Sequence, residues 1–104
     1  MGVNFPLTEA VYYILLSLTK PLHGYGIMQN VERLSGGRLH LAAGTLYGAI
    51  SSMLEKGWIV SASEAEDSRK KQYRMTDAGM QVLKNEYARL QELVNNGKAV
   101  LEDA

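Results

Sequence analysis

The chain has 104 residues, of which 46% are hydrophobic, 21% are charged and none is cysteine. A chain of this length supports one domain with a modest core, and its composition is that of a globular protein rather than a disordered one. The lack of cysteine excludes disulfides and thiolate metal sites and fits a reducing compartment. The sequence shows no apolar run long enough to span a membrane and no signal-peptide pattern. We therefore expect a cytoplasmic protein without a membrane partner.

Basic and acidic residues are equal in number, 11 of each, so the net charge at pH 7 is zero. A nucleic-acid-binding protein usually shows a clear basic excess, which this chain as a whole lacks. The distribution is uneven, because residues 24–75 carry a small basic excess and residues 76–104 an acidic one. This mild asymmetry is compatible with a basic surface in the middle of the chain.

Two helices are predicted in the first third of the chain. Thr8 suits an N-cap and Glu9 a first helical turn, and this helix is expected to extend to about Thr19. It is apolar around more of its circumference than one contact face needs, so it is either deeply buried or packed against a partner. The second helix follows His23 and ends at the glycine pair of residues 36–37, which suits a C-cap and a turn. A short strand is expected within residues 38–41.

The stretch from Leu41 to Val60 predicts a third helix, which ends at Gly57 and leads into a strand. One stripe of this helix is apolar and consists of Leu46, Ile50, Met53 and Leu54. The opposite face carries only small or hydroxylic residues, namely Gly44, Thr45, Gly48, Ser51 and Ser52. A solvated face usually mixes Lys and Glu, so this face favours close docking onto another surface. The major groove of DNA has the width to admit such a helix.

Two β-compatible runs, residues 58–64 and 69–75, flank a short polar loop and predict a β-hairpin. Alternation in the second run places Lys71, Tyr73 and Met75 on one face and Lys70, Gln72 and Arg74 on the other. Three helices and a hairpin with a basic shoulder predict a mainly α (α+β) fold, with a winged helix-turn-helix over residues 1–75. The basic triplet Arg69, Lys70 and Lys71 is either a solvated loop or a wing that touches phosphate or the minor groove.

The final segment, residues 76–104, predicts a long helix that begins after Thr76 as N-cap. Its apolar residues follow a heptad pattern, widened by Leu93 and Val100, with Gly97 at one seam position. At about 1.5 Å per residue this helix is roughly 40 Å long, which is too long to be covered by so small a domain. We therefore expect a dimerisation helix with a second copy of the chain as its partner. The seam residues are Met80, Leu83, Tyr87, Leu90, Val94 and Leu101.

The sequence contains no recognisable catalytic, phosphate-binding or metal-binding motif. His23 and His40 stand outside any motif with carboxylate or hydroxyl partners, and they are more typical of loop or capping residues than of ligands. Trp58 lies at the start of a strand directly after a helix, which is more typical of a core edge than of a ligand-stacking site. We expect neither enzymatic activity nor a cofactor.

Four runs resemble the PadR-like transcriptional regulators in order and spacing: HGYGI (23–27), GTLYGAI (44–50), EKGWI (55–59) and RKKQYRMTDAG (69–79). The single C-terminal helix resembles the compact subfamily. This resemblance implies a bacterial, homodimeric winged-helix repressor that binds a pseudo-palindromic DNA operator. By position it places residues 45–47 at the start of the recognition helix, Tyr25 on the supporting helix and residues 69–71 on the wing. The expected DNA contacts are Tyr25, Thr45, Leu46, Tyr47, Ser51, Ser52, Arg69, Lys70 and Lys71, although Tyr47 could equally be half-buried core.

The chain departs from the family pattern in three places. Gly48 stands where many relatives have proline, and Ala42 stands where many have serine, so a side-chain N-cap is missing. Some compact members bind flat aromatic drugs on a tryptophan of the last helix, and this chain has none there. Drug binding is therefore not expected, and the identity of any small-molecule effector stays open. The alternative function is a protein–protein interaction module that has lost DNA binding, which the zero net charge favours and the basic wing disfavours.

Overall fold

The computed structural model describes residues 6–63 and 70–103, and the statements below refer to these residues. They form a mainly helical fold with a small three-stranded sheet. In chain order the elements are α1 (Glu9–Ser17), β1 (Leu22–His23), α2 (Gly24–Leu34), α3 (Ala43–Glu55), β2 (Ile59–Ser61), β3 (Gln72–Met75) and α4 (Asp77–Glu102). Within the described ranges, no helix is both long and apolar enough to cross a membrane.

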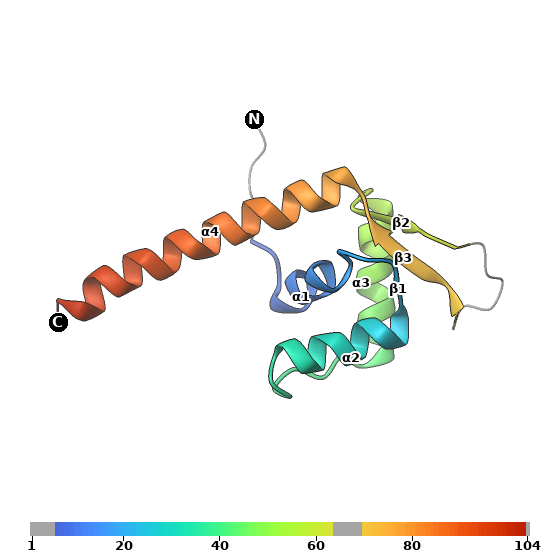
Figure 1. Ribbon diagram of the computed structural model, residues 1–104, viewed down its shortest axis with the longest axis horizontal. Coiled ribbons are helices and arrows are strands. Elements are labelled where there is room, and N and C mark those ends of the chain that lie inside the picture. The colour runs from blue at the N-terminus through green and yellow to red at the C-terminus, as the bar shows by residue number, and fades with distance from the viewer. Residues whose placement is uncertain (1–5, 64–69, 104) are drawn as a thin grey trace.

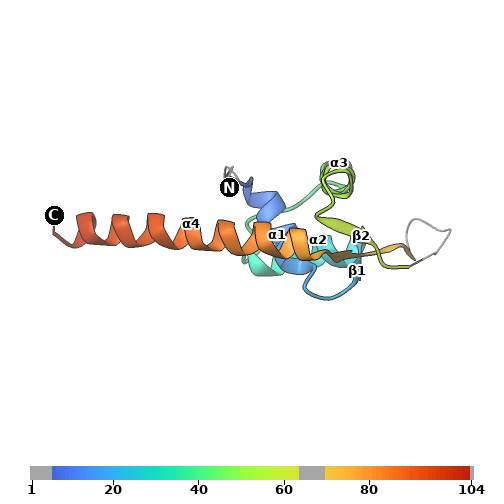
Figure 2. The same cartoon turned by 90° about the horizontal axis from the view of Figure 1, so that it is seen from above.

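The first three helices surround one core, and the sheet closes a side of it (Figure 1). Strand β3 lies in the middle of the sheet and pairs antiparallel with β1 and with β2. Figure 2 shows that α3 stands on one side of the other helices, while α4 extends away from the body. This arrangement is the winged helix-turn-helix with a long C-terminal helix that the sequence predicts.

The core is formed by apolar side chains that come from every helix and from two strands. Leu46, Ile50 and Met53 of α3 are fully or almost fully buried, as the helical periodicity predicts. Leu54, the last residue of that predicted stripe, is instead 39% exposed, as is Leu34 at the end of α2. The buried cluster consists of Ile14, Leu15, Leu18, Ile27, Val31, Leu41, Leu46, Ile50, Met53, Ile59, Tyr73 and Leu83.

Several local signals in the sequence are confirmed. The Thr8 hydroxyl accepts a hydrogen bond from the Val11 N–H, and the Thr76 hydroxyl accepts one from the Gly79 N–H, as expected of N-caps. Gly36, Gly37 and Gly57 have positive φ angles just beyond the ends of α2 and α3. Helix α1 ends at Ser17, slightly before the expected end. The side chains of Tyr12, Tyr13 and Leu16 are half-buried and pack against the core, so burial accounts for part of its apolar circumference.

The strand expected within residues 38–41 is wrong. The strand that completes the three-stranded sheet is β1, which precedes α2. Its Leu22 pairs with Tyr73 and its His23 with Gln72. Residues 38–41 form a connection instead, in which the Leu39 N–H donates to the Ser35 hydroxyl at 2.9 Å and Leu41 is buried. A strand of two residues exists only because β3 offers a free edge, so local composition could not reveal it.

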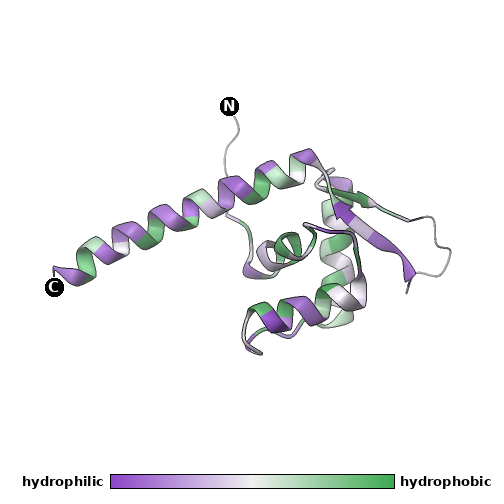
Figure 3. Ribbon diagram, in the orientation of Figure 1, coloured by the Kyte–Doolittle hydropathy of each residue, from purple (hydrophilic) through white to green (hydrophobic). Residues whose placement is uncertain are grey.

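Hydrophobic and hydrophilic residues alternate along helix α4, as the green and purple bands of Figure 3 show. The burial of these residues, however, decreases along the helix. Its first turns are seated on the body through Gly79 and Leu83, which are buried, and Met80, which is half-buried. From residue 91 to residue 103 every residue except Gly97 is exposed. The predicted seam therefore divides into a part that packs on its own body and a part without cover in this chain.

Candidate nucleic-acid interface

Helix α3 presents a smooth, uncharged face to solvent. Its apolar stripe anchors it in the core, and the opposite residues, Ala43, Gly44, Thr45, Gly48, Ser51 and Ser52, are all exposed. A Cβ placed on Gly44 or Gly48 would find no atom within 4 Å, so nothing in the described chain covers this face. A helix that lacks long side chains can bring its backbone close to a partner surface.

The beginning of α3 adds unpaired donors to this face. Ala42 occupies the N-cap position and makes no side-chain cap hydrogen bond, as the sequence predicts. The first turn contains no acidic residue. The first backbone N–H groups and the positive end of the helix dipole are therefore available to an anion such as a phosphate.

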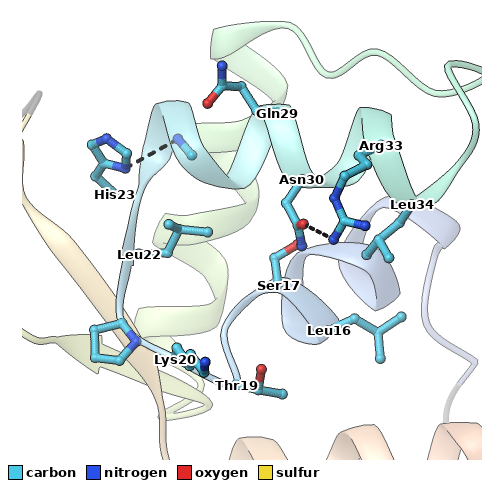
Figure 4. A pocket seen from close by; sticks show the side chains of 12 residues that line it. Leu16, Ser17, Thr19, Lys20, Leu22, His23, Gln29, Asn30, Arg33 and Leu34 are labelled. Atoms are coloured by element: carbon cyan, nitrogen blue, oxygen red, sulfur yellow. Dashed lines mark hydrogen bonds between the residues drawn. The ribbon is translucent and has the colours of Figure 1, made fainter.

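The start of α2 lies directly against α3. The Nδ1 atom of His23 accepts a hydrogen bond from the Gly26 N–H at 3.3 Å and caps α2 (Figure 4), so this histidine is a capping residue as expected. A Cβ on Gly24 would overlap the hydroxyl of Tyr47, which shows how closely the two helices approach. Tyr47 is 37% exposed and Tyr25, the next residue of α2, is 62% exposed. Tyr47 therefore lies where the two helices meet, and the side chain of Tyr25 is exposed at the start of α2.

A polar chain holds α2 against α1 on the other side. The Asn30 amide donates to the Ser17 hydroxyl at 2.9 Å, and that hydroxyl donates to the Tyr13 carbonyl at 2.8 Å. The Arg33 guanidinium donates to the Asn30 side-chain oxygen (Figure 4) at 2.6 Å. These bonds satisfy the buried Ser17 hydroxyl and fix the position of α2, and with it the Gly24 contact that supports α3.

The expected DNA-contact residues do not all reach the surface. Thr45, Ser51 and Ser52 are exposed, whereas Leu46 is 0% exposed and lies in the core. Leu46 therefore cannot touch DNA, and its place in the GTLY run reflects packing. The alternation predicted for the hairpin is confirmed, because Tyr73 is buried and Met75 half-buried while Gln72 and Arg74 are exposed.

On the wing, Lys70 is exposed and Lys71 is half-buried, while Arg69 lies outside the described residues. Arg74 is a further exposed cation on β3, and it was missing from the contacts expected from sequence. The alternation with Gln72 could have identified it. Trp58 packs at the edge of the core as expected, with the Lys56 ammonium 4.8 Å from its ring centroid.

One buried acidic residue was not anticipated at all. Glu86 of α4 is 4% exposed, and its carboxylate accepts hydrogen bonds from the Leu7 N–H and from Arg89. The Arg89 hydrogen bond, aided by the Leu7 N–H, holds the pKa of this carboxyl below its ordinary value, although burial acts in the opposite direction. Among the described residues, no group of three acidic or histidine side chains is placed to hold a metal ion.

Comparison with known proteins agrees with this arrangement. The sequence of a curated Streptomyces fradiae protein, described as an uncharacterized 37.1 kDa protein in transposon TN4556, is 41% identical over 79 residues, which are 75% of this chain. The chain matches only 22% of that relative's length.

Two solved structures share the fold. A PadR family transcriptional regulator from Eggerthella lenta is 27% identical, with 90% of this chain and 82% of that chain covered and a TM-score of 0.72. F93 from STIV, described as a winged-helix DNA-binding protein, superposes with a TM-score of 0.67 over 83% of this chain and 88% of its own, at 17% identity.

A model of the transcriptional regulator PadR-like family matches residues 13–85. This range includes α2, α3, the hairpin and the first turns of α4, which are the elements that build the candidate interface. The chain belongs to the PadR-like family of transcriptional regulators.

Proposed function

We propose that this protein is a homodimeric repressor that binds a pseudo-palindromic DNA operator, with α3 in the major groove of each half-site. The observation that carries the proposal is the exposed face of α3 formed by Gly44, Thr45, Gly48, Ser51 and Ser52, which carries no long and no charged side chain. Such a face fits a groove and can lie close to its floor. The uncapped start of α3 would direct N–H groups at a phosphate.

The surroundings of α3 support this orientation. Tyr47 of α3 and Tyr25 at the start of α2 are both exposed, and their hydroxyls can donate to phosphate oxygens. On the wing, Lys70 and Arg74 are exposed and suit contacts to the neighbouring backbone. Lys71 is partly covered and would contribute less. Glu55, the acidic residue that would repel phosphate, stands at the C-terminal end of α3.

Base recognition by this surface is limited. The Thr45, Ser51 and Ser52 hydroxyls can donate to or accept from several base edges, so they discriminate poorly between base pairs. Operator choice would then depend on the distance between the two α3 helices and on DNA shape. The exposed half of α4 is the proposed surface through which two chains fix that distance.

The test is a DNA-binding titration with fragments of the region upstream of the gene, followed by fluorescence anisotropy. Binding should weaken steeply with salt, because phosphate contacts release counterions. Ser51→Glu, which places a carboxylate on the face of α3, should weaken binding about tenfold or more. Thr19→Glu adds the same charge at an exposed position after α1 and serves as the control.

Equal loss of affinity in Ser51→Glu and Thr19→Glu would contradict the assignment of α3. Repression requires a separate measurement. A reporter gene under the identified operator should become more active when the regulator is deleted. Binding to a protein with no binding to DNA would instead support the interaction-module alternative.

A further inference from the structure

The buried Glu86 joins two distant parts of the chain. Its Oε2 atom accepts a hydrogen bond from the Leu7 N–H at 3.0 Å, although the two residues are 79 positions apart. The Arg89 guanidinium donates two hydrogen bonds to the same carboxylate, from Nε to Oε1 at 2.7 Å and from Nη2 to Oε2 at 2.8 Å. We name this set of three residues, Leu7, Glu86 and Arg89, the clasp.

The clasp is an unusual feature for an outward-facing helix. The neighbouring residue Tyr87 is 61% exposed, whereas Glu86 is 4% exposed. Burial of a carboxylate is costly unless its oxygens are hydrogen-bonded and its charge is paired. Here both oxygens are engaged, and Arg89 supplies the opposite charge. The arrangement therefore holds the chain just before α1 against one place on α4.

Three buried residues, spaced along the first part of α4, pack this helix against the body. Gly79 lies so close to Trp58 that a Cβ would overlap its carbonyl oxygen, Leu83 is buried in the core, and Glu86 makes the clasp. Glu86 is the last buried residue of the helix. After the half-buried Arg89 and Leu90, every described residue of the helix is exposed except Gly97, and a Cβ placed on Gly97 would meet no atom within 4 Å.

The clasp thus lies where α4 leaves the body, at the near end of the exposed part of the helix. The part of α4 beyond Glu86 is about 24 Å long, so a tilt of about 10° there moves the helix end by about 4 Å, more than the ~3.4 Å rise of one base pair. An interaction that fixes this tilt would decide whether the two α3 helices of a dimer match a given half-site spacing.

We infer that Glu86 is a positioning residue, which sets the direction in which α4 leaves the winged-helix body and thereby the spacing between the two operator half-sites. This inference rests on the proposed function, because it assumes a dimer built on α4 that binds two half-sites. Glu86 lies away from the α3 face and touches no DNA in this scheme.

The first experiment measures the direction of α4 without DNA. The chain has no cysteine, so spin labels can be attached at Ser52→Cys on α3 and Asn95→Cys on α4, both exposed positions. Labelled chains are diluted with an excess of unlabelled chains, and the distance between the two labels within one chain is measured by pulsed electron paramagnetic resonance. Glu86→Ala should widen the distance distribution about twofold or more.

Glu92→Ala is the matched control, because it removes an exposed acidic residue from the same helix outside the clasp. Its distance distribution should equal that of the unmodified chain. If Glu86→Ala does not fold, Glu86→Met replaces it, since methionine fills a similar volume but offers the Leu7 N–H no carboxylate oxygen. A distribution as narrow as that of the unmodified chain in the folded Glu86 variant would overturn the inference.

The second experiment measures operator spacing with anisotropy titrations. Operators with base pairs inserted or removed between half-sites should bind the unmodified protein with affinities that differ about tenfold or more per step, and the Glu86 variant with differences of about threefold or less. A merely structural role would lower stability and leave the spacing preference intact, which would overturn the inference. If the unmodified chain binds no DNA, the proposed function fails, while the distance measurement still decides whether the clasp directs α4.

Discussion

Gly79 shows how one missing side chain determines where α4 begins. The space that its Cβ would need is filled by the Trp58 carbonyl oxygen, which already accepts a hydrogen bond from the Thr76 N–H at 2.9 Å. Gly79→Ala should therefore lower the free energy of unfolding by about 2 kcal/mol or more, because backbone atoms must move apart. Gly97→Ala is the matched control on the same helix, since a Cβ there meets no atom within 4 Å. Urea unfolding of both variants decides this, and an equal effect of the two substitutions would contradict the close contact.

The ionisation of Glu86 predicts how the stability of the folded protein depends on pH. Its pKa is lowered from the ordinary 4.5, chiefly by the Arg89 hydrogen bond, so its ionised form stabilises the folded state. The stabilisation is present above the pKa of the unfolded chain and is lost as the pH falls through the lower pKa of the folded state. Between pH 7 and pH 3, urea unfolding should show a larger loss of stability in the unmodified protein than in Glu86→Gln. Equal losses would show that the carboxylate contributes nothing to the pH dependence.

Helix α3 lacks a side-chain N-cap, whereas α1, α2 and α4 each have one. Ala42→Ser would supply a hydroxyl to the first N–H groups of α3, which should raise the free energy of unfolding by about 1 kcal/mol. The same hydroxyl would compete with phosphate for these donors, so DNA affinity should not increase in proportion to stability. Thermal unfolding measures the first effect and anisotropy the second. Ala43→Ser, one position later in the helix, is the control and should not stabilise the protein.

How far the sequence predicts these elements depends on where their causes lie. The caps Thr8 and Thr76 and the turn at Gly57 were predictable because their causes lie within a few residues. Strand β1 was not, because a two-residue strand depends on the free edge of β3. The burial of Glu86 depends on Leu7, which the heptad pattern cannot bring near it.

The candidate interface was predictable to a similar extent. The exposed hydroxyls of α3 follow from helical periodicity, since they lie opposite an apolar stripe. Leu46 belongs to that apolar stripe, and the family resemblance also places it among the DNA contacts at the start of the recognition helix. Because Leu46 is fully buried, its role is in the core. Arg74 lies outside the basic triplet beside the turn, and its exposure follows from the residue-by-residue alternation along β3.

The shape of the whole molecule shows that α4 is incompletely covered by its own chain. The principal extents are 56 × 36 × 21 Å and the radius of gyration is 15.3 Å, against about 13 Å for a compact chain of this length. The excess comes from the end of α4, which projects beyond the body (Figure 1). Its apolar residues Val94 and Leu101 are 63% and 75% exposed. Such a surface is costly in water and typical of an interface between subunits.

Val94→Glu combined with Leu101→Glu should therefore convert the proposed dimer into monomers, because two carboxylates per chain would have to be buried in the seam. The folded body should keep its stability, since both positions are exposed within one chain. Sedimentation at micromolar concentration should show the mass falling from about twice 11.5 kDa to that value, and binding to a full operator should weaken far more than binding to one half-site. Asn96→Glu with Ala99→Glu adds the same charge to the opposite face of the exposed helix and should leave the dimer intact. Should the two double variants dissociate equally, net charge rather than the apolar seam would be the cause, and the proposed dimer surface would have to be abandoned.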